Sequence, residues 1–201
     1  MEFRDVVMKR RAVRRFEEGG VEPEAIERIA RLAQRTPSAG FSQGQRLVVV
    51  TDAARRREVA RICGEEEMVA DFGPWVSECA AQFIPCVSEA IYHRRYQEPD
   101  KIRDDGSEIE WPVPFWYMDA GAAVMLILLA AIDEGLGAGL TGVPKELAAE
   151  LGAAFGIPED VTIVAHVTIG VPAPDPGWSA VTSRRTKPRR PPTESVHWER
   201  W

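Results

Sequence analysis

The chain has 201 residues, of which 45% are hydrophobic and 28% are charged, and its formal net charge is −6. This length and composition predict one globular domain over residues 1–201 and exclude a disordered or collagen-like chain. The acidic balance argues against a nucleic-acid partner.

Three cysteines without a C-x-x-C pair argue against a disulfide framework or a structural zinc site. The three histidines are widely spaced, so we expect no metal, and His166 reads as a core histidine with its hydrogen bonds satisfied. The longest apolar run, Ala120 to Ile132, is shorter than a bilayer span, and charges interrupt the N-terminal apolar runs. We therefore expect no membrane contact and a cytoplasmic protein.

Apolar spacing predicts helices over 2–10 and 24–35, with an extended basic connector over 10–16. Residues 36–40 are helix breakers. The β-branched run 47–51 predicts a buried central strand, and Asp52 is a candidate cap for a helix over 53–62. In the apolar run 82–87, Pro85 favours an edge strand or a short one.

Residues 92–114 are polar, contain aromatic rings and have prolines near both ends, which is typical of a long surface excursion that acts as a lid. Residues 115–134 form a helix that is apolar on nearly all sides, as in a core or an oligomer interface. A helix over 145–155, a strand over 161–169 and a proline-rich tail over 173–201 follow. Trp198 and Trp201 end this tail, and we expect them to pack against protein. Four or five helices and three to four strands without β-α-β alternation predict an α+β fold.

Four segments carry candidate chemistry. Residues 10–15 hold four arginines in six positions, which suits an anionic ligand or simply a solvated turn. Residues 36–45 are small or neutral polar, as in a ligand-contacting loop or an ordinary connector. In residues 135–142, Gly137, Gly139 and Gly142 match G-x-G-x-x-G, but a helix precedes them instead of a strand, and Gly135 or Gly137 stands where a helix C-cap would. We therefore expect an exposed glycine-rich backbone rather than a dinucleotide fingerprint. Residues 184–190 are basic and suit either anion binding or a solvated tail.

Taken in order and spacing, these segments resemble the nitroreductase family of flavoproteins. The matching pieces are KRRAVRRF, TPSAGFSQGQRLVVV, DAGAAVMLILLAAIDEGLGAGLTGV, and VTIGVP followed by KPRRPPTESVHW. The resemblance spans nearly the whole chain. It implies an α+β fold with a central mixed or antiparallel sheet surrounded by helices, an intertwined homodimer, and FMN bound between the subunits.

The resemblance also implies a role for individual residues. Arg10 and Arg11 match the arginine pair that holds FMN, and Arg14 matches the basic residue that faces the pyrimidine end of the flavin. Pro37, Ser38, Ala39 and Gln43 match a loop that contacts FMN from the second subunit. Leu140, Thr141 and Gly142 match a segment whose backbone amides approach flavin N5 and O4. Lys187 and Arg189 match a phosphate clamp. Three positions depart from the family pattern: Ala12 replaces a serine or threonine, Phe41 an asparagine, and Gly44-Gln45 a Pro-Trp pair.

The implied function is an FMN-dependent oxidoreductase that moves reducing equivalents from NAD(P)H to an electron-poor acceptor such as a nitroaromatic, a quinone or an activated alkene. The flavin carries the chemistry, so no side chain need act as acid or base. Aromatic rings of the excursion either form a pocket for this small-molecule acceptor or only anchor the loop: Tyr96, Trp111, Phe115 and Trp116. The alternatives are a flavin-consuming or dehalogenating enzyme on the same scaffold, a protein that uses the deazaflavin F420, and a non-catalytic binding module.

Overall fold

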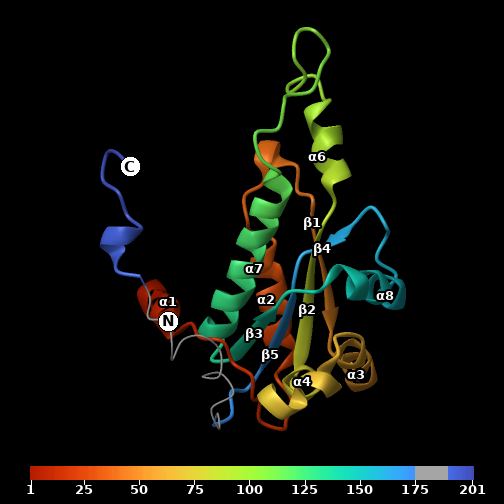
Figure 1. The fold of residues 1–201 in the computed structure, drawn as a ribbon, viewed down its shortest axis with the longest axis vertical. Coiled ribbons are helices and arrows are strands. Elements are labelled where there is room, and N and C mark those ends of the chain that lie inside the picture. The colour runs from red at the N-terminus through yellow and green to blue at the C-terminus, as the bar shows by residue number, and fades with distance from the viewer. Residues whose placement is uncertain (175–189) are drawn as a thin grey trace.

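The computed structural model of the protein describes residues 1–174 and 190–201 (Figure 1). In this part of the chain, five strands form one sheet with helices on both faces. All strand pairs are antiparallel, which confirms the predicted α+β class and the antiparallel sheet. The strand order is β1 (Gln45–Val50), β2 (Ala81–Val87), β5 (His166–Gly170) and β3 (Gly137–Thr141), and the short β4 (Thr162–Ile163) also pairs with β2.

Two long helices, α2 (Pro23–Ala33) and α7 (Phe115–Asp133), cover one face of the sheet. Ile29 of α2 and Ile127 of α7 are fully buried against the strands, as the apolar periodicity of both segments predicts. The short helix α1 (Phe3–Lys9) contacts the C-terminal end of α7, where the Met1 ammonium group lies 2.8 Å from Asp133.

The opposite face carries α3 (Ala53–Ile62), α5 (Trp75–Glu78) and α8 (Lys145–Phe155), with α4 (Glu65–Phe72) between α3 and α5. The Asp52 carboxylate accepts a hydrogen bond of 2.9 Å from the Arg55 N–H, so the predicted N-cap of α3 is confirmed. Val59, Val76 and Leu151 are completely buried and form the core on this side.

The predicted positions of two strands in the sheet are wrong. β1 lies at an edge, whereas β2 is central and buried along its whole length despite Pro85. Phe83 of β2 pairs with Val167 of β5, and Cys86 of β2 pairs with Ile163 of β4. An advance of three residues along β2 therefore lies opposite an advance of four residues from Ile163 to Val167. This extra residue is a bulge between β4 and β5, and Pro85 lies opposite it, where the ladder is interrupted. The same bulge divides the single strand expected over 161–169 into two.

In the glycine-rich segment after α7, residues 137–139 differ from the expectation of an exposed backbone, whereas Leu140 and Gly142 are exposed. Gly135, with φ of 78°, ends the helix, and the Leu136 N–H donates to the Ala131 carbonyl at 2.8 Å. The chain then enters β3, whose first three residues are buried. The glycines therefore serve a helix end and a closely packed edge strand.

The excursion starts as a helix, α6 (Glu89–Tyr96), and continues as a loop over 97–114 that projects from one end of the molecule (Figure 1). Tyr92 at its start is fully buried, so this residue belongs to the core and the surface excursion is shorter than expected.

Helix α7 confirms the predicted long apolar helix. By length and composition it is the one described helix that could cross a membrane, yet half of it is buried against the sheet and α2, as in core helices of soluble proteins. Its free side presents a stripe of Met118, Gly121 and Met125 at helical spacing, with the two methionines 58% and 46% exposed.

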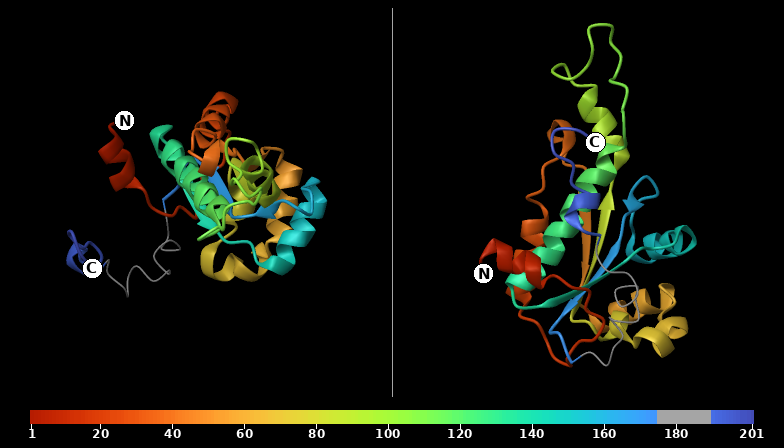
Figure 2. Two further views of the ribbon diagram at one scale, coloured as in Figure 1. Left: turned by 90° about the horizontal axis from the view of Figure 1, so that it is seen from above. Right: turned by 60° about the vertical axis from the view of Figure 1, so that its left-hand side comes forward.

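The last described segment, 190–201, contains a short 3-10 helix, η2 (Pro192–Glu194), and lies apart from the body of the protein (Figure 2). Trp198 and Trp201 are 85% and 100% exposed. Trp201 stacks on His197 with ring centres 4.4 Å apart, and among the described residues neither tryptophan packs against the body of the protein as expected.

Candidate active site

The basic segment 10–16 lies beside the glycine-rich strand β3. The Val13 N–H donates to the Ala138 carbonyl at 2.9 Å, and Ala12 forms a parallel bridge with Ala138. A Cβ on Gly137 would lie 2.9 Å from the Val13 side chain, and one on Gly139 would lie 2.7 Å from the Val13 carbonyl oxygen. The two glycines thus permit this approach, and two motifs far apart in the sequence become neighbours.

Beyond Ala138, β3 offers an open backbone edge. The Ala138 carbonyl accepts a hydrogen bond from Val13, so the backbone N–H and C=O of Ala138 point away from β5. These groups alternate sides along a strand, so those of Leu140 also point away from β5. In residues 1–174 and 190–201, no strand pairs with this edge at Leu140. Gly142 continues the edge by the same alternation, whereas the Thr141 backbone faces β5, so Leu140 and Gly142 can donate hydrogen bonds to the rim of a flat ligand.

The arginines of the basic segment point to different surroundings. The Arg14 guanidinium lies 5.5 Å from the Phe72 ring centre and 5.6 Å from that of Trp75, within range of cation–π attraction. Arg10 directly follows α1 and is half-buried. Successive side chains of an extended segment alternate sides, so Arg10 and Arg14 lie on the side opposite to Arg11.

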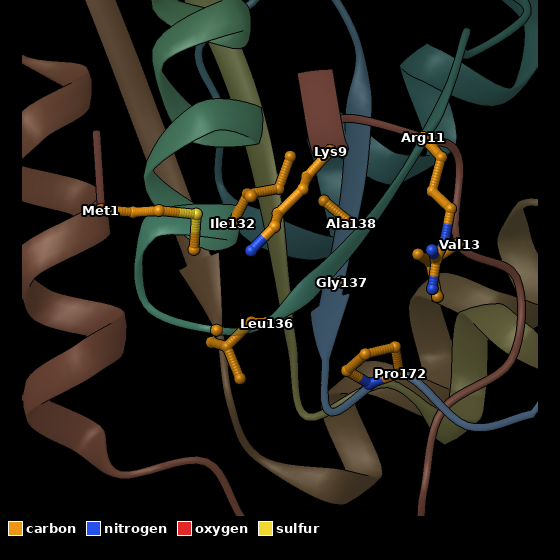
Figure 3. A pocket seen from close by; sticks show the side chains of 10 residues that line it. Met1, Lys9, Arg11, Val13, Ile132, Leu136, Gly137, Ala138 and Pro172 are labelled. Atoms are coloured by element: carbon orange, nitrogen blue, oxygen red, sulfur yellow. The ribbon is translucent and has the colours of Figure 1, made fainter. Parts of the chain in front are cut away.

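Arg11 lines a separate hollow of about 300 Å³ together with Lys9 and Val13 (Figure 3). The floor of this hollow is the turn from α7 into β3, residues 135–138. Arginine forks and a lysine ammonium group at its rim would favour an anion.

The loop 36–45 is held at the other end of α7. The Ala39 N–H donates to Asp119 Oδ2 at 2.9 Å, the Gln43 N–H donates to Ser38 Oγ at 2.9 Å, and Gln45 Nε2 donates to the Pro37 carbonyl at 3.3 Å. The helix axis from Asp119 to Ala131, next to the start of β3, spans about 18 Å at 1.5 Å per residue. Within one chain, the loop and the basic segment are therefore two separate parts of the predicted site.

The four aromatic residues predicted to meet the acceptor do gather in one cluster. The Trp111 ring centre lies 4.5 Å from Tyr96, 6.0 Å from Phe115 and 5.6 Å from Trp116. Glu108 accepts a hydrogen bond of 2.5 Å from Trp111 Nε1 and lies 2.7 Å from His93 Nδ1. This acid therefore holds the loop against α6, and the role of the cluster in binding an acceptor stays a prediction.

Burial keeps His166 and the cysteine thiols neutral. Desolvation lowers the pKa of His166 to about 4, and neither of its buried ring nitrogens has a hydrogen-bond partner among the described residues, which differs from the expectation of a satisfied histidine. Desolvation also raises the pKa of the Cys63 thiol to about 11 and those of Cys79 and Cys86 to about 12. These thiols are free and stay protonated, as expected of buried cysteines.

The remaining predicted residues and hollows add little to this arrangement. Lys187 and Arg189, the predicted phosphate clamp, lie outside the described residues. A larger hollow of about 820 Å³ beside α8 is lined mainly by small apolar residues, and none of the predicted site residues lines it.

Sequence reasoning missed three residues that support the candidate site. Phe72 and Trp75 flank Arg14, and Asp119 anchors the loop. A lone acid near the start of an apolar helix is a readable signal for Asp119, because a buried carboxylate needs donors from somewhere else in the fold. The aromatic pair gives no comparable signal, since core helices commonly carry such rings.

Comparison with known proteins identifies the family of this chain. The sequence profile described as "Nitroreductase family" matches residues 7–171. The chain belongs to the nitroreductase family. As a member of this family it is an oxidoreductase.

Two relatives are named as NADH dehydrogenase/NAD(P)H nitroreductases. The one from Methanothermobacter thermautotrophicus is 30% identical, with 100% of this chain and 88% of the relative covered. The one from Archaeoglobus fulgidus is 27% identical, with 98% of this chain and 97% of the relative covered. Among solved structures, NADPH:FMN oxidoreductase from Vibrio harveyi in complex with NAD+ shares the fold, with a TM-score of 0.72, 22% identity, and coverage of 99% of this chain and 77% of that one.

Proposed function

We propose that this protein is an FMN-dependent oxidoreductase that takes reducing equivalents from NAD(P)H and delivers them to an electron-poor small molecule. The observation that carries the proposal is the basic segment 10–16 lying against the open edge of β3. Guanidinium groups suit a phosphate and an electron-rich carbonyl, and an open strand edge suits a planar ring system. Membership of the nitroreductase family and the names of the similar proteins support the same cofactors.

Each part of FMN would be bound by a different group of residues. Arg10, together with Lys187 and Arg189 of the tail, would hold the phosphate, and Arg11, which lines the separate hollow, would add only a weaker, longer-range attraction. Arg14 would face the pyrimidine end of the ring system, kept in place by Phe72 and Trp75. In the predicted segment Leu140, Thr141 and Gly142, the amides of Leu140 and Gly142 would donate along the edge that carries N5 and O4, and Thr141, whose backbone faces β5, would hold the segment in place.

Bound FMN would supply the redox chemistry, accepting a hydride from NAD(P)H and passing two electrons to the acceptor. The chain would contribute binding, orientation and electrostatics. A fixed positive charge at Arg14 would stabilise negative charge that develops at the pyrimidine end of the ring. The buried thiols and the neutral His166 play no part, which agrees with a site that needs no side-chain acid or base.

A second copy of the chain would complete the site. The loop with Pro37, Ser38, Ala39 and Gln43 lies at the far end of α7 from the basic segment, so a two-fold partner is needed to bring a loop to each flavin. The exposed stripe of Met118, Gly121 and Met125 on α7 and the exposed rings of Trp198 and Trp201 give such a homodimer its apolar contacts.

The acceptor would be a flat, electron-poor molecule such as a nitroaromatic, a quinone or an activated alkene. The aromatic cluster around Trp111 offers ring faces for stacking, and the acids of the loop 97–114 disfavour anions. In this proposal the loop 97–114, the surface part of the excursion predicted over 92–114, acts as a lid, and residues 173–201 act as a strap in one domain spanning 1–201. The protein would work in the cytoplasm without nucleic-acid or membrane partners.

The decisive experiment is to identify the cofactor of the purified protein. We expect a yellow protein that releases FMN on denaturation and that oxidises NADH or NADPH when a quinone or nitroaromatic is added. Titration of the apoprotein with FMN and with F420 in parallel separates the two flavins. Turnover only with a haloaromatic, or with oxygen and consumption of the flavin, would favour the alternative enzymes on this scaffold. A colourless protein that ignores both cofactors would contradict the proposal and favour a binding module.

A further inference from the structure

Asp119 is a buried acid in the first part of α7, and its side chain is 5% exposed. A single oxygen, Oδ2, accepts a hydrogen bond of 2.9 Å from the Ala39 N–H and another of 2.9 Å from the Tyr92 hydroxyl. Among the ion pairs of the described residues, none includes Asp119. A buried carboxylate is costly unless its donors are fixed, so these two bonds constrain the three segments they join.

Tyr92 extends the connection to the other end of the loop. Its ring is fully buried against Gly44, where an added Cβ would lie 2.3 Å from the ring. Burial and the hydrogen bond to Asp119 both raise the pKa of the Tyr92 hydroxyl, so it remains a donor over the whole physiological range. Tyr92 therefore fixes Gly44 through its ring and Ala39 through Asp119.

Helix α6 adds two contacts at the middle of the loop. Arg95 Nε donates to the Gly40 carbonyl at 2.9 Å, and a Cβ on Gly40 would lie 2.7 Å from the Tyr96 ring. The loop 39–44 is therefore attached along its length to α6 and α7.

The backbone between these anchors adopts an unfavourable shape. Gly40, Phe41 and Gln43 have φ of 57°, 58° and 53°, in the left-handed region that side chains such as phenylalanine rarely enter. Such a conformation persists where the surrounding contacts enforce it. Here Ser38 Oγ accepts from the Gln43 N–H, and Ser42 Oγ donates to the Ala39 carbonyl at 2.6 Å.

We propose that Asp119 is a positioning residue for the flavin: it sets the backbone of Ala39, and with it Ser38, in the geometry that the cofactor meets. Asp119 itself touches no ligand and acts only through the loop. This inference rests on the proposed function, because it assumes that residues 37–43 contact FMN. A residue inside the hydrophobic core would thus affect FMN binding without contacting the cofactor.

The test compares two conservative variants with a matched control on the same helix. Asp119→Asn keeps the shape but removes the charge that attracts both donors, and Tyr92→Phe removes only one donor. Asp133→Asn makes the same chemical change at the exposed end of α7. Each apoprotein is titrated with FMN by fluorescence quenching, well below its own unfolding temperature, and the visible circular dichroism of the bound flavin is recorded.

We expect Asp119→Asn to weaken FMN binding about tenfold and Tyr92→Phe about threefold, in line with the loss of hydrogen bonds to a charged group. Both variants should change the visible dichroism, and Asp133→Asn should change neither. A variant that is merely less stable still binds FMN normally at a temperature where it is folded, so the two readouts separate positioning from folding.

The outcomes distinguish this inference from the proposed function. If the unaltered protein binds FMN and both Asp119→Asn and Tyr92→Phe match it in affinity and dichroism, the positioning role is wrong and the proposed function stands. If Asp119→Asn does not fold, Tyr92→Phe decides the question alone. If the unaltered protein does not bind FMN, the proposed function is contradicted and this inference with it.

Discussion

The two parts of the candidate site are built in opposite ways. The basic segment 10–16 is held by its backbone, through bonds such as Val13 N–H to Ala138 and Ala173 N–H to Arg15. The loop 36–45 is instead held by side chains, those of Ser38 and Asp119 among them. A segment paired through its backbone presents its side chains to a ligand, whereas a loop fixed by side chains presents its backbone and small groups. The first part thus suits recognition of charge, and the second suits close approach to a flat ring.

The largest effect should come from breaking the proposed homodimer, which brings the loop of one chain to the basic segment of the other. Met125→Lys places a charge on the exposed stripe of α7, and an unpaired charge buried in an interface costs several kcal/mol. We expect a monomer in light scattering that binds FMN at least about a hundredfold more weakly.

Val69→Lys is the matched control, because Val69 is 41% exposed and lies on the acidic helix α4. It should leave both properties unchanged. A monomeric Met125→Lys protein with normal FMN affinity would show that one chain forms the whole site.

The basic segment should respond according to the side on which each arginine lies. Arg10→Ala removes a charge-assisted bond to phosphate worth about 1.5–3 kcal/mol and should weaken FMN binding about ten- to a hundredfold. Arg11→Ala, whose side chain lines the hollow with Lys9, should cost about threefold or less. Fluorescence titration measures both.

Arg189→Ala should resemble Arg10→Ala if the tail joins the phosphate site. Unchanged affinity in Arg10→Ala and Arg189→Ala would remove the phosphate assignment. An Arg11→Ala effect larger than that of Arg10→Ala would place the phosphate in the hollow of Figure 3 instead.

The loop should be sensitive to steric change where it meets Tyr92. Gly44→Ala puts a methyl group 2.3 Å from a fully buried ring, and overpacking of this kind costs about 1–3 kcal/mol. For a protein of this size we expect Tm to fall by roughly 2–10 °C in calorimetry.

Gly20→Ala provides the control, since an added Cβ there has no described atom within 4 Å. If Gly44→Ala unfolds at the same temperature as the unaltered protein, the ring of Tyr92 does not fix the loop.

A smaller effect is expected in the aromatic cluster that continues from the loop into the lid. Trp111→Ala removes a ring that contacts Tyr96, Phe115 and Trp116, and should raise KM for a quinone or nitroaromatic about three- to tenfold. FMN affinity should not change. Loss of both properties together, or of neither, would reduce the cluster to a structural anchor.

The smallest effect concerns pH. Desolvation lowers the pKa of His93, but the bonds and charges of Glu108 and Glu89 outweigh it, so the pKa is raised above its ordinary 6.5. A raised histidine pKa stabilises the folded protein fully below pH 6.5, and this stabilisation is lost as the pH rises through the folded-state value. Because His93 is 37% exposed, the gain is well under that of a buried pair.

Tm measured against pH should therefore decline slightly above neutrality in the unaltered protein, and His93→Gln should remove that part of the decline. Identical profiles for the two proteins would show that the His93–Glu108 contact contributes nothing to holding the loop.

Sequence patterns located most helices because an amphipathic or wholly apolar helix is defined by neighbours three and four residues away. The helix ends at Asp52 and Gly135 followed from local capping chemistry in the same way. Strand order did not follow, since pairing partners are distant in the chain. Pro85 shows the limit: its tolerance in a central strand depends on a bulge some 80 residues later.

The candidate site shows the same difference between local sequence patterns and long-range contacts. Arg10, Arg14, Ser38 and Gly142 could be proposed as site residues from the sequence because family motifs carry residue types at fixed spacings, and their roles stay predictions. Asp119 was visible only as a polar exception in an apolar helix, and its partners Ala39 and Tyr92 belong to two other segments.

The sequence by itself determined the fold class and the family and pointed to the segments proposed to face a flavin, because composition, periodicity and motif spacing are local properties of the chain. Only the tertiary structure decided that the basic segment lies against β3, that β2 rather than β1 is central, and that the loop 36–45 is fixed from within the core by Asp119 and Tyr92. These are contacts between residues tens to more than a hundred positions apart. Their geometry is set by the packing of whole elements, which no local pattern encodes.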